Sequence, residues 1–286
     1  MTVRVFDWTD AAGRAGVLAL ALLAPAALAE EVLPRWEWGL GVAGASLPHY
    51  RGSTYSETYA LPLPYVVYRG EFLKIGRDGV RGRLYESDRV RFDISGGGSV
   101  PVSSDKDPLR EGMPDLLPSV ELGPSMDVTL FRPTEDRRLR VRFPFRAAAA
   151  VSFDEFESLG WVFHPHLDWR DADFADGWAL RARLGPLLAH RDFHRYYYDV
   201  APQYATPERP AYSTDGGYSG TSFSLATSKR FTRLRVGAFL RYDNLAGAEF
   251  ADSPLVETEH AVSGGIALVW RLGQSKTVVP RDVDVE

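Results

Sequence analysis

Two stretches near the C-terminal end decide the fold: TRLRVGAFLRYD at residues 232–243 and HAVSGGIALVWRL at residues 260–272. In each stretch two sets of residues alternate, and a period of two is the pattern of a β-strand with two different faces. In the first stretch one set is Leu234, Val236, Ala238, Leu240 and Tyr242, and the other is Arg233, Arg235, Gly237, Phe239 and Arg241. Segments 90–97 and 138–145 alternate in the same way, so the sequence predicts an all-β protein.

The predicted strands suit a membrane-spanning barrel better than a soluble sandwich. Many run for about 10 to 14 residues, whereas strands of soluble proteins usually have about five or six. Arginines recur on one strand face, which is costly against a dry core but stable in a wet barrel lumen. Aromatic residues near strand ends resemble the interfacial girdles of outer-membrane barrels. These residues are Trp36, Trp38, Tyr65, Tyr68, Trp161, Phe163, Trp178, Phe231, Tyr242 and Trp270.

We expect a transmembrane antiparallel β-barrel of the outer-membrane type with about twelve strands. The predicted strands are 36–46, 58–69, 71–76, 79–86, 89–101, 117–131, 138–152, 159–170, 177–189, 220–230, 232–243 and 260–272. Bacterial barrels have short periplasmic turns and longer outer loops in alternation. The would-be periplasmic connections near 70, 87–88, 132–137, 171–176 and 231 are all short. Of the would-be outer loops, those near 47–57, 102–116, 190–219 and 244–259 are long, whereas those near 77–78 and 153–158 are short. The connection lengths therefore support the same architecture.

The first 29 residues have the plan of a secretory signal peptide. The apolar run AGVLALALLAPAAL at residues 15–28 follows Arg14, and small residues end it at Ala27-Leu28-Ala29. The run is too short for a transmembrane helix, and Pro25 interrupts it. We expect cleavage after Ala29, a barrel over residues 30–272, and a polar C-terminal tail over residues 273–286. The protein would then be exported and inserted into an outer membrane.

Composition excludes several classes of function. The chain of 286 residues has no cysteine, which excludes disulfides, thiolate metal sites and cysteine nucleophiles. Its net charge of −5, with 33 basic and 38 acidic residues, lacks the footprint of a nucleic-acid binder. The glycines at 96–98 lack the lysine and helix of a phosphate-binding loop, and they favour packing relief within a strand.

Five motifs, in sequence order, resemble those of one protein family. The first is WGLGVAGASLPHYRGSTYSETYALPLPYVVYRG at residues 38–70. It is followed by YYDV (Tyr197, Tyr198, Asp199, Val200), GYSG at 217–220, GAFLRY at 237–242 and ADSPLV at 251–256, which contains Asp252, Ser253 and Pro254. They resemble the MltA-interacting protein family, also called MipA/OmpV, a family of Gram-negative outer-membrane proteins, and the first motif is similar to the opening of that family. Family members usually end their last strand at an aromatic C-terminus, whereas here a polar tail follows Leu272.

The resemblance implies an outer-membrane scaffold without catalytic residues or cofactors. The name-giving member is thought to bridge a murein lytic transglycosylase and a peptidoglycan synthase, so we expect these partners, besides outer-membrane lipid and without nucleic acid. A small channel for solute or antibiotic passage is the alternative function. A barrel hydrolase is a third, since His190, His194 and His260 lie near predicted outer strand ends and Ser222, Ser224 and Ser263 lie on strands.

The residues expected to face the lumen are mostly arginines. They are Arg140, Arg142, Arg181, Arg183, Arg233, Arg235 and Arg241, with Asp93, Glu121 and Asp127 as facing acids. A ladder of structural ion pairs is the favoured interpretation, because charged residues in such interiors generally pair. An anion-attracting interior that tunes passage is the alternative.

Two further segments leave their role open. His164 and His166, with Asp168, Asp171 and Asp173 close behind, have the composition of a metal site, but Pro165 separates the histidines and a third ligand from another strand is not identifiable. We therefore expect no metal site there. The tyrosine-rich loop at 190–219 suits either adhesion or an inward-folded plug.

Overall fold

Strands make up most of the computed structural model, which describes residues 32–76 and 79–280. The predicted signal peptide at residues 1–29 lies outside the described residues. The wall strands are β2 (Trp36–Pro48), β3 (Ser56–Arg69), β4 (Leu73–Gly76), β5 (Gly79–Glu86), β6 (Val90–Gly98), β7 (Ser119–Phe131), β8 (Arg137–Val151), β9 (Phe156–Phe163), β10 (His166–Ala175), β11 (Trp178–Ala189), β12 (Gly217–Arg230), β13 (Leu234–Asn244) and β14 (His260–Gln274). The other elements are β1 (Val32–Pro34), β15 (Val278–Pro280), helix α2 (Arg191–Tyr198) and short 3-10 turns at Ser104–Lys106 and Pro202–Tyr204.

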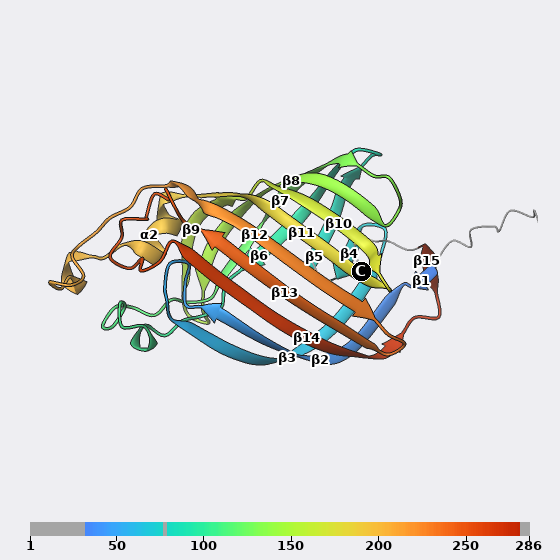
Figure 1. The fold of residues 1–286 in the computed structure, drawn as a ribbon, viewed down its shortest axis with the longest axis horizontal. Helices are drawn as coiled ribbons and strands as arrows, with labels where there is room; N and C mark the ends of the chain where they lie inside the picture. Colours follow the sequence, from blue (N-terminus) through green and yellow to red (C-terminus); the bar gives the residue numbers. More distant parts are fainter. Residues whose placement is uncertain (1–31, 77–78, 281–286) are drawn as a thin grey trace, which may run out of the picture.

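The wall strands form one antiparallel sheet that closes into a barrel (Figure 1). β9 and β10 share one strand position, because both pair with β8 on one side and with β11 on the other. The break between them falls at His164 and Pro165, where proline has no N–H to donate to a ladder. With β9 and β10 taken as one, the described chain has twelve wall strands, as the alternation predicted. No helix within the described residues is long and apolar enough to cross a membrane.

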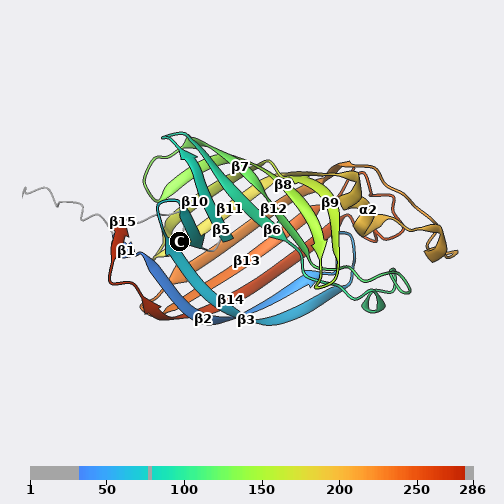
Figure 2. The ribbon, with the colours of Figure 1, turned by 180° about the vertical axis from the view of Figure 1, so that it is seen from behind.

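The two ends of the barrel differ, as Figure 2 also shows. The loop end carries the connections 49–55, 99–118, 190–216 and 245–259, together with α2. The turn end carries the short connections 70–72, 87–89, 132–136, 176–177 and 231–233. β1 and β15 pair with each other at the turn end, with Val32 opposite Pro280 and Pro34 opposite Val278. Part of the predicted polar tail thus pairs with the segment that precedes the barrel.

The outward face of the wall is apolar. Its exposed side chains include Leu40, Val42, Val66, Leu122, Leu184, Leu225, Leu240, Ile266 and Leu272. Exposed aromatic rings lie toward both ends, with Trp36, Trp38 and Trp270 at the turn end and Phe145 and Tyr242 nearer the loop end. Tyr65 was expected in these girdles but faces the lumen, since its hydroxyl lies 3.4 Å from the buried carboxylate of Glu37. It has the strand phase of Leu63 and Val67, which face inward.

The buried apolar core lies at the loop end rather than along the barrel. It is a cluster from four loops and the adjoining strand ends: Tyr50, Val102, Leu116, Ala148, Ala150, Leu159, Val162, Leu187, Ala189, Phe193, Tyr197, Tyr198, Val200, Leu245, Ala248, Phe250 and Leu255. We call the loops that carry this cluster the loop cap. Because side chains of distant loops bury one another, the long loops are folded onto the barrel mouth.

One edge of the wall lacks a partner strand over most of its length. β3 pairs with β2 throughout, but on its other side, within the described chain, it pairs with β4 only at Tyr68 and Arg69. The N–H of Arg69 donates to the carbonyl of Arg35, on the β2 side. Because N–H groups alternate along a strand, Pro62 and Pro64 have their missing N–H on the opposite, open side. Proline is tolerated on such an edge, so Pro62 and Pro64 are compatible with the missing strand partner on this side of β3.

Candidate functional site in the barrel lumen

Inward-facing charges form rows that cross neighbouring strands. Because the strands pair in register, residues opposite one another lie about 4.8 Å apart around the wall. The Asp127 row consists of Arg91, Asp127, Arg142 and His166. The Asp168 row consists of Thr129, Arg140, Asp168, Arg183, Ser224, Arg241 and Ser263. The Arg170 row consists of Arg138, Arg170, Arg181, Ala226, Phe239, Gly265 and Ala45.

Asp127 pairs with two arginines inside the wall. The Nε of Arg142 donates to both carboxylate oxygens at 2.9 Å, and Nη1 of Arg140 lies 3.7 Å from Oδ2. The hydroxyl of Ser125 also donates to Oδ1 at 3.0 Å. All these side chains are buried, and the multiple partners satisfy a carboxylate that would otherwise be costly to desolvate.

Asp168 is shared by three guanidinium groups. Arg181 donates to it through both Nε, at 2.8 Å, and Nη2. Arg142 and Arg183 approach the same carboxylate at 3.8 and 3.9 Å. Arg142 is also bound to Asp127, so Asp127 and Asp168 share the guanidinium groups of Arg140, Arg142, Arg181 and Arg183.

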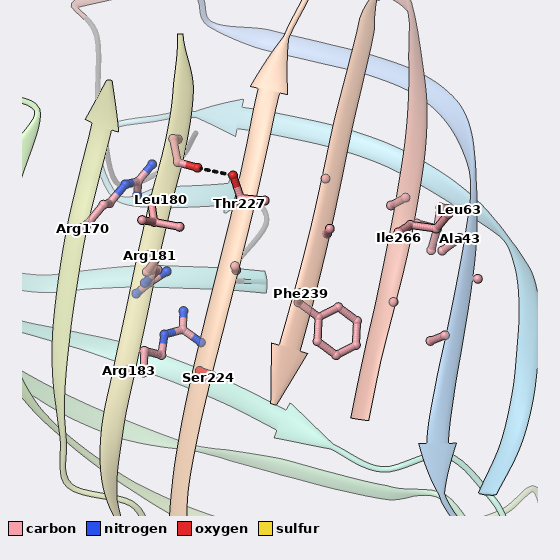
Figure 3. Close-up of a pocket in the computed structure, with 18 residues that line it drawn as sticks. Ala43, Leu63, Arg170, Leu180, Arg181, Arg183, Ser224, Thr227, Phe239 and Ile266 are labelled. Atoms are coloured by element: carbon pink, nitrogen blue, oxygen red, sulfur yellow. Dashed lines mark hydrogen bonds between the residues drawn. The ribbon is translucent and has the colours of Figure 1, made fainter. Parts of the chain in front are cut away.

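The Arg170 row brings three arginines together from adjacent strands. Arg138, Arg170 and Arg181 occupy facing positions on β8, β10 and β11. Like charges at facing positions repel, and the bond of Arg181 to Asp168 compensates part of this repulsion. The row then changes character, because Ala226 and Phe239 follow on β12 and β13. Figure 3 shows Arg170, Arg181 and Arg183 on one side of the cavity and the Phe239 ring on the other.

A cavity of about 420 Å³ lies between these two kinds of wall. Its lining combines Arg170, Arg181, Arg183 and Ser224 with Ala43, Ala45, Leu63, Ala226, Gly237, Phe239, Gly265 and Ala267. The ring of Phe239 lies over Gly265, where an added Cβ would come within 2.7 Å of ring atom Cε1. The absence of a side chain at Gly265 thus makes room for the ring. The cavity has one cationic side and one smooth apolar side.

A second chamber of about 570 Å³ lies under the loop cap. Its strand walls hold two ion pairs, Arg146 with Glu121 at 3.1 Å and Arg241 with Asp243 at 2.7 Å. Its lining also includes Phe193, Tyr197 and Tyr198 of the cap. The cap therefore forms the ceiling of a charged chamber.

The motif residues of the YYDV and ADSPLV segments hold the cap together. Tyr198 stacks on Phe250 with ring centroids 3.6 Å apart, and its hydroxyl donates to the carbonyl of Arg51 at 2.9 Å. Ser253 donates to the carbonyl of Tyr198 at 2.7 Å. The α2 part of the tyrosine-rich loop thus packs over the barrel mouth, whereas residues 205–208 farther along the loop are exposed.

The other motif residues take different places in the same cap. Asp199 follows the last turn of α2 and accepts the N–H of Thr214 at 2.8 Å. Val200 is buried and pairs with Tyr212, and Tyr197 is buried beside Phe193. Asp252 is exposed and Pro254 is half-buried, so these two contribute less to the core.

Nine of the ten residues expected in the lumen lie on inward-facing strand positions. They are Asp93, Glu121, Asp127, Arg140, Arg142, Arg181, Arg183, Arg235 and Arg241. Arg233 differs, because β13 begins at Leu234 and Arg233 is exposed in the preceding turn. The interior also holds Arg138, Arg170 and Asp168, which the sequence interpretation did not assign to the lumen. On β8, Arg138 alternates in step with Arg140 and Arg142, and on β10, Asp168 and Arg170 are two residues apart. This alternation in the sequence could have predicted that they face the lumen.

The polar side chains of the histidine-rich segment at residues 164–173 contact other protein groups. His166 Nδ1 hydrogen-bonds to the carbonyl of His164 at 2.7 Å, Asp168 is held by arginines, and Asp171 pairs with Arg137. Among the described residues, no group of three or more His, Cys, Asp or Glu side chains is placed to hold a metal ion. A Ser–His contact does exist, since Ser222 Oγ lies 3.0 Å from His164 Nε2, but no hydrogen bond of His164 in the described chain reaches a carboxylate.

The comparison with solved structures found channel proteins of low sequence identity. The NanC porin is 11% identical, with 82% of this chain and 100% of that chain covered and a TM-score of 0.38. The CymD monoaromatic hydrocarbon channel is 13% identical, with 88% and 92% covered and a TM-score of 0.38. A comparison with curated protein sequences gave no match. At the level of families, residues 40–272 match the MltA-interacting protein MipA.

Proposed function

Because the chain belongs to the MltA-interacting protein MipA family, we propose that it is a non-enzymatic outer-membrane scaffold that binds a murein lytic transglycosylase at its turn end. The family match supports this role, since it runs from β2 to β14 and so covers the whole barrel. In the expected orientation the short turns face the periplasm, where murein enzymes work. A peptidoglycan synthase is the second partner that such a scaffold would bring close.

The turn end offers a defined surface for this contact. β1 and β15 form a two-stranded ribbon there, and the exposed side chains of Val32 and Val278 lie on it. Short exposed strands can accept a further strand from a partner through main-chain hydrogen bonds. The loop end is occupied by the cap, so the turn end is the better candidate for a periplasmic partner.

A pull-down from envelope extracts tests the scaffold role. The full-length protein should recover a lytic transglycosylase, and deletion of residues 275–286, which removes β15, should reduce that recovery. A cap variant such as Phe250→Ala is the matched control, because it alters the opposite end and should recover the enzyme normally. Recovery of no murein enzyme by the intact protein would contradict the proposal.

A second candidate function is a narrow anion-preferring channel. The observation that favours it is the series of lumen cavities lined by arginines, including those of about 420 and 570 Å³. Reversal potentials in planar bilayers under a salt gradient would test it. Anion preference that falls in Arg183→Gln supports the channel, whereas no conductance, or conductance without anion preference, contradicts it.

A hydrolase role receives less support. The Ser222–His164 contact lies in the loop-end part of the lumen, but an acyl-transfer triad also needs a group that orients the histidine. A serine-reactive probe tests this directly. Labelling of wild-type protein that disappears in Ser222→Ala would contradict the non-enzymatic proposal.

A further inference from the structure

We infer that the cavity between the Arg170 row and the small-residue wall binds an amphipathic organic anion, with its carboxylate on the arginines and an alkyl chain along β2, β3 and β14. This site is separate from the proposed turn-end contact, and it needs no passage through the barrel. Its ligand class follows from the two walls of the cavity and from a path that leads sideways to the unpaired edge of β3.

The anionic end of the ligand is set by the arginines. Arg170 and Arg181 lie on facing strands, and Arg183 is the next inward residue of β11. The Arg183 side chain keeps 35% of its surface exposed, and its Nε is 3.9 Å from Asp168. A guanidinium with this exposure can turn toward a ligand carboxylate and donate two parallel hydrogen bonds.

The apolar end is set by the wall across from the arginines. Phe239 lies two strands from Arg181 in the same row, about 10 Å away at a strand spacing of about 4.8 Å. It keeps 41% of its surface exposed although it faces the lumen. Around it stand Ala43, Ala45 and Ala267. A smooth wall of this kind, in line with a positive charge, is complementary to an alkyl chain that carries a carboxylate.

A second cavity continues the path toward the side of the barrel. It has a volume of about 310 Å³ and shares Leu63, Gly237 and Ala267 with the first cavity. Its lining then reaches Pro64 on β3 and Gly76 at the end of β4. The second cavity also has Tyr65, Ser228 and Arg235 in its lining, beside Val66 and Val269. A chain that extends from Arg183 therefore passes the three shared residues before it reaches β3.

Strand pairing is interrupted where this path ends. Among the described residues, β3 has no strand partner beside Pro62 and Pro64, and β5 pairs with β6 only as far as Asp93. Figure 2 looks onto this side, where the short strands β4 and β5 connect β3 to β6 within the sheet. Toward the loop end the gap is bridged by contacts from the loop that follows β6, such as Lys106 with Glu57 at 2.6 Å. An amphiphile in the surrounding lipid can therefore insert its chain between β3 and β6, with its charge inside.

Equilibrium binding of radiolabelled decanoate to the purified, detergent-solubilised full-length protein tests the site. Decanoate should bind with a stoichiometry of one per protein. 1-Decanol lacks the charge and acetate lacks the alkyl chain, so both should compete poorly with decanoate. Arg183→Gln and Phe239→Ala should each weaken binding by about tenfold or more, because each removes one half of the complementarity. Equal competition by 1-decanol, or unchanged affinity in both variants, would overturn the proposal.

Two matched pairs separate binding from damage to the fold. Phe223→Ala removes an outward-facing ring of similar exposure from β12, and it should bind decanoate like the wild type. Gly237→Leu fills the junction of the two cavities, where an added Cβ would meet no atom closer than 3.6 Å, and it should abolish binding. The matched control is Val236→Leu on the same strand, because Val236 has the outward strand phase and lines neither cavity, and this variant should bind decanoate normally. Binding retained in Gly237→Leu would overturn the assigned path.

The position of the chain is tested by photolabelling in lipid vesicles. A decanoate analogue with a diazirine on its last carbon should label residues 63–66 of β3, beside the open edge. Vesicle-bound and aqueous ligand are distinguished by preloading the analogue in the bilayer or adding it outside. Labelling confined to the loop cap, or labelling that is lost when the analogue is preloaded in the bilayer, would overturn the sideways path.

Discussion

Arg142 hydrogen-bonds to Asp127 symmetrically, because its Nε lies 2.9 Å from each carboxylate oxygen, and both side chains are buried. Asp127→Asn keeps the shape but removes the charge that compensates Arg140 and Arg142. Breaking a buried pair from one side typically costs about 3 to 5 kcal/mol, and we expect a loss of that order. The measurement is the free energy of unfolding in urea, followed by heat-modifiable gel mobility.

The exposed carboxyl of Asp154 provides the control for that change. Asp154→Asn should leave the unfolding midpoint unchanged. The double variant Asp127→Asn with Arg142→Gln should cost less than the sum of the two single changes, since they remove one shared interaction. Simple additivity would show that the pair does not act as a unit.

Stacking of Tyr198 on Phe250 should govern the loop cap and leave the barrel intact. Phe250→Ala removes a fully buried ring and should destabilise the cap by about 3 to 5 kcal/mol. The expected result is rapid protease cleavage within 190–216 and 245–259, with heat-modifiability of the barrel retained. Phe153→Ala, at a fully exposed ring of another loop-end connection, should have no such effect. Equal protease resistance of both variants would contradict the cap as described.

The cap should also loosen in acid because of His194. Burial of its ring lowers the pKa of His194 to about 4 from an ordinary value of 6.5, and Arg51 acts in the same direction. The neutral ring donates from Nδ1 to the carbonyl of Asp215 at 2.7 Å and packs edge-on against Phe250. Below pH 6.5, His194 binds a proton in the opened cap but stays neutral in the closed cap. The stability of the cap should therefore be complete above pH 6.5 and fall progressively toward pH 4.

Protease cleavage rates of the cap across that interval measure the effect. His194→Asn cannot titrate there, so its cleavage rate should change less between pH 6.5 and 4 than that of the wild type. A wild-type profile that is flat over this interval, or one that His194→Asn fails to alter, would rule out this histidine as the origin.

Replacing the two prolines of β3 should cost little, because their missing N–H groups face the open edge. Pro62→Ala and Pro64→Ala together should change the unfolding free energy by less than about 1 kcal/mol, whereas Ala238→Pro, which places proline in a strand paired on both sides, should cost about 3 kcal/mol or more. Urea unfolding of both variants measures the contrast. A large loss from the proline replacements would mean that they serve packing rather than the edge.

Alternation along the chain was sufficient to predict the barrel, the strand number and the two unlike ends. Leu234 to Tyr242 alternate without interruption, so their faces could be assigned directly. The phase of Arg233 was misjudged only because a strand boundary lies next to it. Exact ends depend on turn geometry, which a period of two does not report.

The site was predictable only in part. The inward arginines follow from strand phase, but the Arg138–Arg170–Arg181 alignment depends on register between β8, β10 and β11, which a single strand does not encode. The inward position of Asp168 was obscured by its neighbours, whose composition suggested metal ligands. The cap depends on contacts between loops far apart in the chain, such as Ser253 with Tyr198. The meaning of Pro62 and Pro64 became clear only once the N–H of Arg69 showed which side of β3 faces β2.

The ribbon of β1 and β15 has a consequence for the order of assembly. It joins the first and last described strands, and the barrel beside it closes by the pairing of β2 with β14. Nearly the whole chain must therefore be synthesised before either pairing can form. Contacts of such high sequence separation slow folding, because the entropy of closing the loop is lost before the contact stabilises it. A polypeptide truncated before β14 can form neither the β1–β15 pairing nor the β2–β14 pairing. Premature termination therefore leaves an unclosed chain that envelope proteases can cleave, instead of a smaller barrel.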